Sequence, residues 1–198
     1  MRLPLFIHLL DRSTRPTPMI KGNLAEKRVA FIINRLIPKK GGYLINDILL
    51  PISEGKVTQV DHIYVSPYGV FVIETKALAG SIYGKTSDDN WVTFLSGQKY
   101  QIYNPVRQNA LHVAALETNV KMPEEPISLV TILAANIKNV EAENVFNLPG
   151  LEKYLLGLEE EILLEDEVED IYKQIMEFKE HPVMSKEEFL RSLRGKKS

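Results

Sequence analysis

The sequence contains no cysteine among its 198 residues. This absence excludes a disulfide scaffold, a thiol nucleophile and any zinc site built on thiolates. The sequence also lacks an apolar run of the ~20 residues that a membrane span needs. Leu3 to Leu10 is mostly apolar, but Pro4 and His8 interrupt it and a charged flank follows, which is not the pattern of a signal peptide. We therefore expect a cytoplasmic protein without a membrane partner.

Neither sign of charge predominates strongly along the sequence, except in one acidic segment. Residues 1–150 carry a net charge of +3, residues 151–180 carry −8 and residues 181–198 carry +3. The mildly basic body is only weak evidence for a nucleic-acid partner. Apolar residues interleave the acidic segment, which favours a solvated helix face over an interaction tail. With 44% hydrophobic and 25% charged residues, the composition is that of one globular domain with a small appendage.

Hydrophobic periodicity predicts an α/β fold. Apolar residues at helical spacing and β-branched runs alternate along the chain, with turn residues between them. We expect a mixed β-sheet core flanked by helices, with a helical C-terminal extension. The predicted segments are helices over 22–37 and 105–120, strands over 43–50, 57–66, 70–76, 80–84, 91–95 and 127–135, and further helices after 149.

Polar residues on two consecutive predicted strands carry the strongest chemical signal. Gln59 and Asp61 lie on the first strand, and Glu74 and Lys76 lie on the second. Pro67 between them fixes a negative φ and excludes a two-residue turn of the primed types. The hairpin register decides which of the four side chains share a face, because strand side chains alternate.

Two registers remain possible for this hairpin. A three-residue loop would pair Ser66 with Val70 and turn Glu74 away from Asp61. A four-residue loop would pair Val65 with Val70, set Asp61 opposite Glu74, and set Gln59 opposite Lys76. Two carboxylates directly opposite each other destabilise a sheet unless a positive charge compensates them.

The second register outlines a hydrolytic metal centre. Asp61 and Glu74 would hold Mg²⁺ or Mn²⁺, with the Thr75 carbonyl as a further ligand. Lys76 would position the attacking water or stabilise charge on a phosphate. The competing interpretation is an ordinary hairpin with a salt-bridged polar face.

Residues on the two predicted helices could complete this site. Glu26 falls inside the apolar arc of the first helix, where a carboxylate needs a paired base or a metal. Gln108 and His112 are four residues apart and share one helix face, so Gln108 could orient a ligand. Arg107 and Lys27 flank the proposed site and could contact phosphates.

Several separated motifs together resemble the NERD (nuclease-related) domain over roughly residues 20–135. The matching segments, in order, are Thr58–His62, Ser66–Lys76, Gly80–Gly84, Trp91 and Asn104–Asn109. The resemblance implies the PD-(D/E)xK superfamily, with a restriction-endonuclease-like core and Mg²⁺-dependent cleavage of nucleic acid. It also favours the four-residue hairpin loop.

The resemblance assigns roles residue by residue. Asp61 matches the motif aspartate, and Glu74 and Lys76 match the (D/E)xK pair. Glu26 matches the acidic residue of the first core helix, and Gln108 matches the glutamine of the following core helix. Val60 stands where the superfamily's name has proline, a position that does no chemistry.

We therefore predict a Mg²⁺- or Mn²⁺-dependent nuclease acting on nucleic acid, with DNA as the expected substrate. Asp61, Glu74, Lys76, Glu26 and Gln108 form the predicted catalytic set. The predicted metal ligands are Asp61, Glu74, Thr75 and Glu26, and the predicted nucleic-acid contacts are Gln59, Arg107 and Lys27. The alternative is a non-catalytic binding module that retains the nuclease fold.

The chain divides in this interpretation into a segment over 1–21, a nuclease-like domain over 22–148 and a helical extension over 149–198. The extension packs on the core, and its apolar positions could also form a homodimer.

Overall fold

The computed structural model describes residues 22–195, so the predicted segment 1–21 lies outside the described residues. Five helices and seven strands occur in this range. The helices are α1 (Gly22–Lys40), α2 (Pro105–Asn119), α3 (Leu148–Leu156), α4 (Glu165–Glu180) and α5 (Lys186–Gly195). The strands are β1 (Tyr43–Ser53), β2 (Lys56–Ser66), β3 (Gly69–Lys85), β4 (Asn90–Leu95), β5 (Gln98–Tyr103), β6 (Ile127–Glu141) and β7 (Val145–Phe146).

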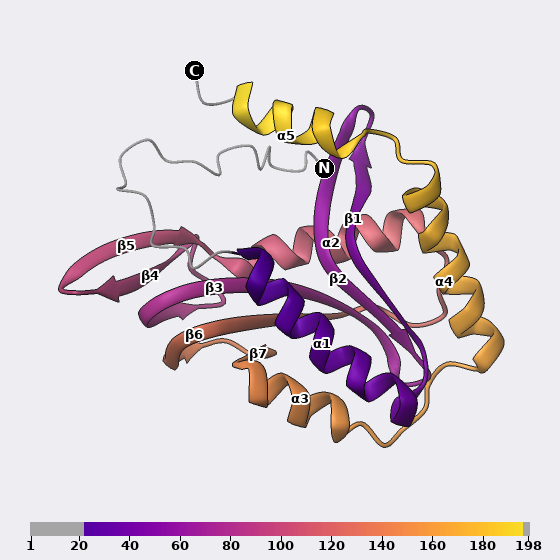
Figure 1. The fold of residues 1–198 in the computed structure, drawn as a ribbon, viewed down its shortest axis with the longest axis horizontal. Helices are drawn as coiled ribbons and strands as arrows, with labels where there is room; N and C mark the ends of the chain where they lie inside the picture. Colours follow the sequence, from indigo (N-terminus) through magenta and orange to yellow (C-terminus); the bar gives the residue numbers. More distant parts are fainter. Residues whose placement is uncertain (1–21, 196–198) are drawn as a thin grey trace.

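The strands form one mixed sheet (Figure 1). Each of the strands β1 to β5 pairs in antiparallel order with the strand that precedes or follows it in the sequence. β6 runs parallel to β3 and to β7. A parallel neighbour needs a crossover, and α2 supplies it between β5 and β6. The predicted mixed sheet flanked by helices is therefore confirmed.

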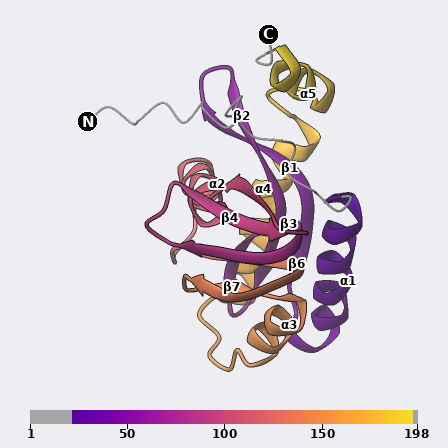
Figure 2. The same cartoon turned by 90° about the vertical axis from the view of Figure 1, so that its left-hand side faces the viewer.

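Helices cover both faces of the sheet (Figure 2). On one face, α2 and α4 pack against β1, β2 and β3 through a core that includes Val65, Val72, Leu116 and Ile171. On the other face, α1 and α3 pack against side chains such as Phe71. The alternation of strand side chains thus assigns even positions in the first half of β3 to the α2 face and odd positions to the α1 face.

The hairpin between β2 and β3 has the predicted four-residue register. Val65 pairs with Val70, Ser66 pairs with Gly69, and Pro67 and Tyr68 form the tip. Gly69 has a φ of +124°, a value that L side chains rarely adopt. The three-residue alternative is therefore wrong.

The structure corrects several predicted boundaries. The segments 70–76 and 80–84 are one continuous strand that bends at Gly80, where φ is +87°. A Cβ on Gly80 would lie 2.0 Å from the Phe94 carbonyl oxygen, so only glycine allows β4 this close. β5 was not predicted. α1 does not end at Pro38 but continues to Lys40, because a proline in the last turn removes only one donor.

The C-terminal helices lie against different parts of this core. α3 packs beside α1, and α4 packs across β1 and β2. α5 begins with a capping box, in which the Ser185 amide donates to Glu188 and the Glu188 amide donates back to Ser185 Oγ. Among residues 22–195, no helix is both long and apolar enough to cross a membrane.

Candidate active site

The site lies where β2 and β3 separate. Their pairing ends at His62 and Ile73. Beyond that point β2 remains paired with β1, while β3 remains paired with β6. Asp61 closes the fork, because its Oδ2 accepts a hydrogen bond from the Thr75 amide at 2.8 Å. A side-chain carboxylate here satisfies a backbone donor that the β2 ladder no longer reaches.

The fork directs its polar side chains towards α2. Glu74 and Lys76 continue the even positions of β3, beyond Val72 in the α2-facing core. Asp61 lies where the two strands part, where it accepts the Thr75 hydrogen bond and lies within electrostatic range of Glu74 and Lys76. The structure therefore brings Asp61, Glu74 and Lys76 together, but Asp61 is not paired directly opposite Glu74 as predicted, because the β2–β3 ladder stops at His62 and Ile73.

Glu74 is the centre of a buried hydrogen-bonded network. Its side chain is 2% exposed, and its Oε1 lies 2.6 Å from Lys76 Nζ. Its Oε2 lies 3.1 Å from His112 Nε2 on α2. Lys76 Nζ also donates to Gln108 Oε1 at 2.8 Å, which ties the strand to the first half of α2. A buried carboxylate is tolerated in this setting because both of its oxygens are paired.

The pKa values of the two carboxyl groups shift in opposite directions. Burial and the negative charge of Glu74 raise the pKa of Asp61 to about 8. Burial alone would also raise the pKa of Glu74, but Lys76 and His112 outweigh burial and lower it. The surroundings therefore favour a proton on Asp61 and a negative charge on Glu74.

α1 brings Glu26 to the edge of this network from the opposite face. Burial and the nearby charge of Asp47 raise the pKa of Glu26, whereas Lys186 and Lys76 oppose the shift. Lys186, the first residue of α5, also forms an ion pair with Asp47. The C-terminal helix therefore reaches back to within electrostatic range of the site, a contact that sequence analysis missed.

Comparison with known proteins agrees with this geometry. The sequence profile described as "Nuclease-related domain" (NERD) matches residues 21–134, a range that contains every residue of the fork and both helices beside it. The chain belongs to the NERD family. The PD-(D/E)xK superfamily is the general context of this domain.

The NERD chain also has a curated relative. An uncharacterized protein of Bacillus anthracis is 30% identical over 165 residues, covering 80% of this chain and 77% of the relative. No solved structure matches the NERD chain.

Three predicted nucleic-acid contacts of the NERD domain do not converge on the fork. Gln59 does not pair with Lys76, because β2 has already left β3; its Nε2 donates to Asp47 Oδ1 at 2.7 Å. Arg107 forms an ion pair with Asp89 and donates to the Ser87 carbonyl oxygen. Lys27 lines a hollow between α1 and α3 instead of the fork.

His112 is the site residue to which sequence analysis gave no role. Its Nδ1 lies 2.9 Å from Thr58 Oγ1, and its Nε2 lies beside Glu74. When the Thr58 hydroxyl donates to Nδ1, the ring N–H at Nε2 donates to Glu74. The spacing of four residues from Gln108 was the available signal, since it places both side chains on one face of α2.

The fork offers the carboxylates of Asp61 and Glu74 as possible ligands for a metal ion. In residues 22–195 no three His, Asp or Glu side chains gather into a metal-binding group, so Glu26 does not join Asp61 and Glu74 in a cluster. Mg²⁺ commonly takes one or two carboxylates and keeps several waters. The two neighbouring carboxyl groups of the fork therefore suit the usual coordination of Mg²⁺ in proteins.

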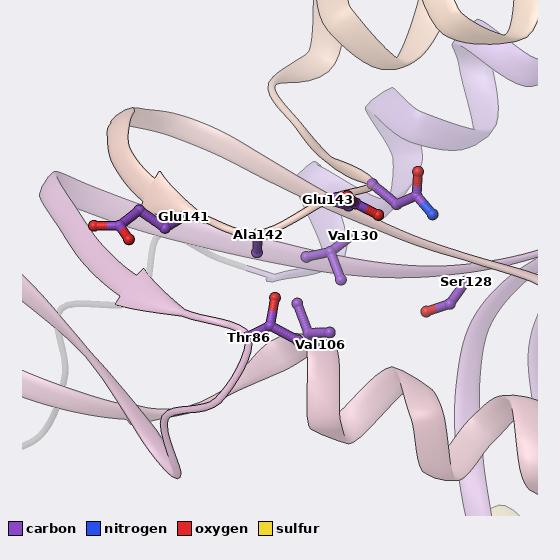
Figure 3. Close-up of a pocket in the computed structure, with 8 residues that line it drawn as sticks. Thr86, Val106, Ser128, Val130, Glu141, Ala142 and Glu143 are labelled. Atoms are coloured by element: carbon purple, nitrogen blue, oxygen red, sulfur yellow. The ribbon is translucent and has the colours of Figure 1, made fainter.

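The larger hollow of the NERD domain lies elsewhere. It has a volume of about 680 Å³ and is lined by Val106 at the start of α2, by Val130 on β6, and by Glu141 and Glu143 near the turn between β6 and β7 (Figure 3). None of the fork residues lines it. The candidate site therefore rests on side-chain chemistry and not on the size of a cavity.

Proposed function

We propose that this NERD domain is a metal-dependent nuclease that hydrolyses phosphodiester bonds of nucleic acid, with DNA as the substrate. One observation carries the proposal: half-buried Asp61 lies beside buried Glu74 at a strand fork, next to Lys76. Like charges so placed cost stability in the absence of a cation. Membership of a nuclease-related family also supports the proposal that the fork is a nuclease site.

Asp61 and Glu74 would hold the ion, with the Thr75 carbonyl as a further proposed ligand, and Glu26 would act only through its charge from outside the ligand set. Bound Mg²⁺ or Mn²⁺ would polarise a phosphoryl oxygen and lower the pKa of a water molecule. Asp61 would release its proton when it becomes a ligand, because only the carboxylate form coordinates well. Binding of the ion is therefore expected to be tighter above pH 8 than at pH 6.

Lys76 and Gln108 have positioning and electrostatic roles in this proposal. The Lys76 side chain is 22% exposed, so a phosphate at the fork could reach it. It would stabilise negative charge that develops on the phosphate oxygens. Gln108 Oε1 accepts from Lys76 Nζ and limits its rotamers. His112 acts through Glu74 and is a positioning residue.

The test is calorimetric titration of Mg²⁺ and Mn²⁺ into the wild type and Asp61→Ala, followed by cleavage assays on single- and double-stranded DNA and on RNA. We expect Asp61→Ala to lose metal binding and cleavage. Lys76→Ala should lose cleavage while it stays folded. Asp170→Ala removes an exposed carboxylate from α4 and serves as the matched control.

Equal cleavage by the wild type and both site variants would refute the assignment. Nucleic-acid binding without metal binding or cleavage, also in the presence of an oligonucleotide, would instead support the alternative of a binding module that retains the fold.

A further inference from the structure

The outward face of α1 carries cations around an exposed aromatic ring. Lys27, Arg28 and Arg35 are exposed, and Phe31 between them is 62% exposed. The Arg35 guanidinium carbon lies 5.8 Å from the centre of the Phe31 ring. Glu26 is the single carboxylate in the α1 sequence, and it approaches the fork on another side of the helix. The charged side chains on the outward face of α1 are therefore all cations.

This face borders a hollow rather than a flat surface. The hollow has a volume of about 400 Å³ and lies between α1 and α3, which run side by side (Figure 1). Its lining combines the cations with apolar atoms of Phe31, Ile32 and Leu148, and Glu152 is the one acidic residue in it. Cations that flank an exposed ring in a hollow match a ligand with negative charges and flat apolar faces.

Single-stranded nucleic acid has both properties. Its phosphates pair with Lys and Arg, and its unstacked bases stack on aromatic rings. A duplex hides its base faces, so it could use the cations but not the ring. We propose that the outward face of α1, which we define as Lys27, Arg28, Phe31 and Arg35, binds a single-stranded segment of the nucleic acid next to the bond that is cleaved.

This inference rests on the proposed nuclease function and extends it by naming the substrate class. Continuity with the site supports it, because Glu26, one residue before Lys27, lies within electrostatic range of Glu74 and Lys76. A strand that leaves the fork past Glu26 would reach the cations of α1 next. Phe31 would then prefer a base that is not paired.

The inference can be tested separately from cleavage. Fluorescence anisotropy of 20-nucleotide oligo(dT), oligo(U) and a 20-base-pair duplex is measured with the full chain in EDTA, so that no metal chemistry is needed. The variants are Phe31→Ala and Arg28→Gln/Arg35→Gln, and Lys173→Gln on α4 is the control for loss of an exposed cation. Thermal unfolding verifies that each variant folds.

We expect the wild type to bind single strands more tightly than the duplex. Phe31→Ala should weaken single-strand binding about 5- to 100-fold and leave duplex binding nearly unchanged. Arg28→Gln/Arg35→Gln should reduce the slope of log affinity against log salt by about 1.4, the value for two lost phosphate contacts on a single strand. Lys173→Gln should match the wild type. The oligo(dT) and oligo(U) arms separate DNA from RNA.

Three results would overturn the inference. The first is single-strand affinity that Phe31→Ala leaves unchanged. The second is a loss in Lys173→Gln as large as in the double variant, which would mean diffuse charge attraction. The third is a dimer that Phe31→Ala converts to a monomer, which would assign this face to a second copy. Asp61→Ala distinguishes the two proposals, because it should lose cleavage and retain single-strand binding.

Discussion

Replacement of Asp61 by asparagine should stabilise the metal-free protein, and the gain should grow with pH. Asparagine keeps an oxygen that can accept the hydrogen bond from the Thr75 amide, but it carries no proton to lose. The folded wild type holds the proton of Asp61 up to a pKa of about 8, whereas unfolded Asp61 loses it near 3.8. Between these values the folded state binds more protons, so the stability of the wild type falls as pH rises.

The size of this stability difference follows from the pH interval between the unfolded and folded pKa values of Asp61. One proton of difference changes the free energy of unfolding by about 1.4 kcal/mol per pH unit. From pH 5 to pH 7.5, the advantage of Asp61→Asn over the wild type should therefore increase by about 3 kcal/mol. Above pH 8 the difference should level off, because both the folded and the unfolded wild type are then ionised.

Urea unfolding in EDTA at pH 5, 6, 7.5 and 8.5 measures this difference. Asp170→Asn is the control, because it removes an exposed aspartate of α4 that is not part of the fork and should follow the wild type at every pH. Parallel stability curves for Asp61→Asn and the wild type would refute the reasoning. A variant that is less stable than the wild type at pH 7.5 would show that Asp61 acts as a structural ion-pair partner. With saturating Mg²⁺ the order should reverse, because only the wild type gains binding energy.

Three further predictions concern other parts of the structure. His112→Ala should lower cleavage and cost about 2 kcal/mol of stability, since it removes a hydrogen bond to buried Glu74, and His112→Gln should recover part of both in the same assays. Gly80→Ala should cost more than the roughly 1–3 kcal/mol of backbone strain at positive φ. Gly97→Ala, with positive φ but no atom nearby, gives the strain alone in chemical unfolding. Lys186→Ala should cost less than about 1 kcal/mol in thermal unfolding, because its ion pair with Asp47 is exposed.

Local information reduced the hairpin to two registers, and the resemblance to the NERD domain then favoured the four-residue loop. Pro67 excludes the primed two-residue turns, and the period of two then leaves only a small number of alignments. Once Val65 pairs with Val70, strand alternation predicts Asp61 directly opposite Glu74. The ladder instead stops at His62 and Ile73, and Asp61 accepts the Thr75 amide while it stays within electrostatic range of Glu74. The sequence therefore predicted that the two carboxyl groups lie near each other, but not how Asp61 is held.

The fork itself could not be predicted, because the residues of the hairpin do not show where β2 leaves β3. β3 loses β2 from one edge after Ile73, whereas residues 127–133 of β6 pair along its other edge before and after that point. Gln59 was therefore placed opposite Lys76 although β2 has diverged. His112 was missed for a related reason: its role depends on how α2 crosses the sheet, and helical spacing alone does not contain that information.

The hydrogen bond to the Thr75 amide does not by itself explain why residue 61 is an aspartate. An unpaired Thr75 amide needs an acceptor, and an asparagine oxygen would serve it without adding charge. Aspartate instead places a second carboxyl group against Glu74, whose own charge Lys76 and His112 already maintain. The hydrogen bond explains why an acceptor stands there, but not why that acceptor is an acid. A cation shared with Glu74 supplies the missing reason, because it converts the repulsion between the two carboxylates into a binding site.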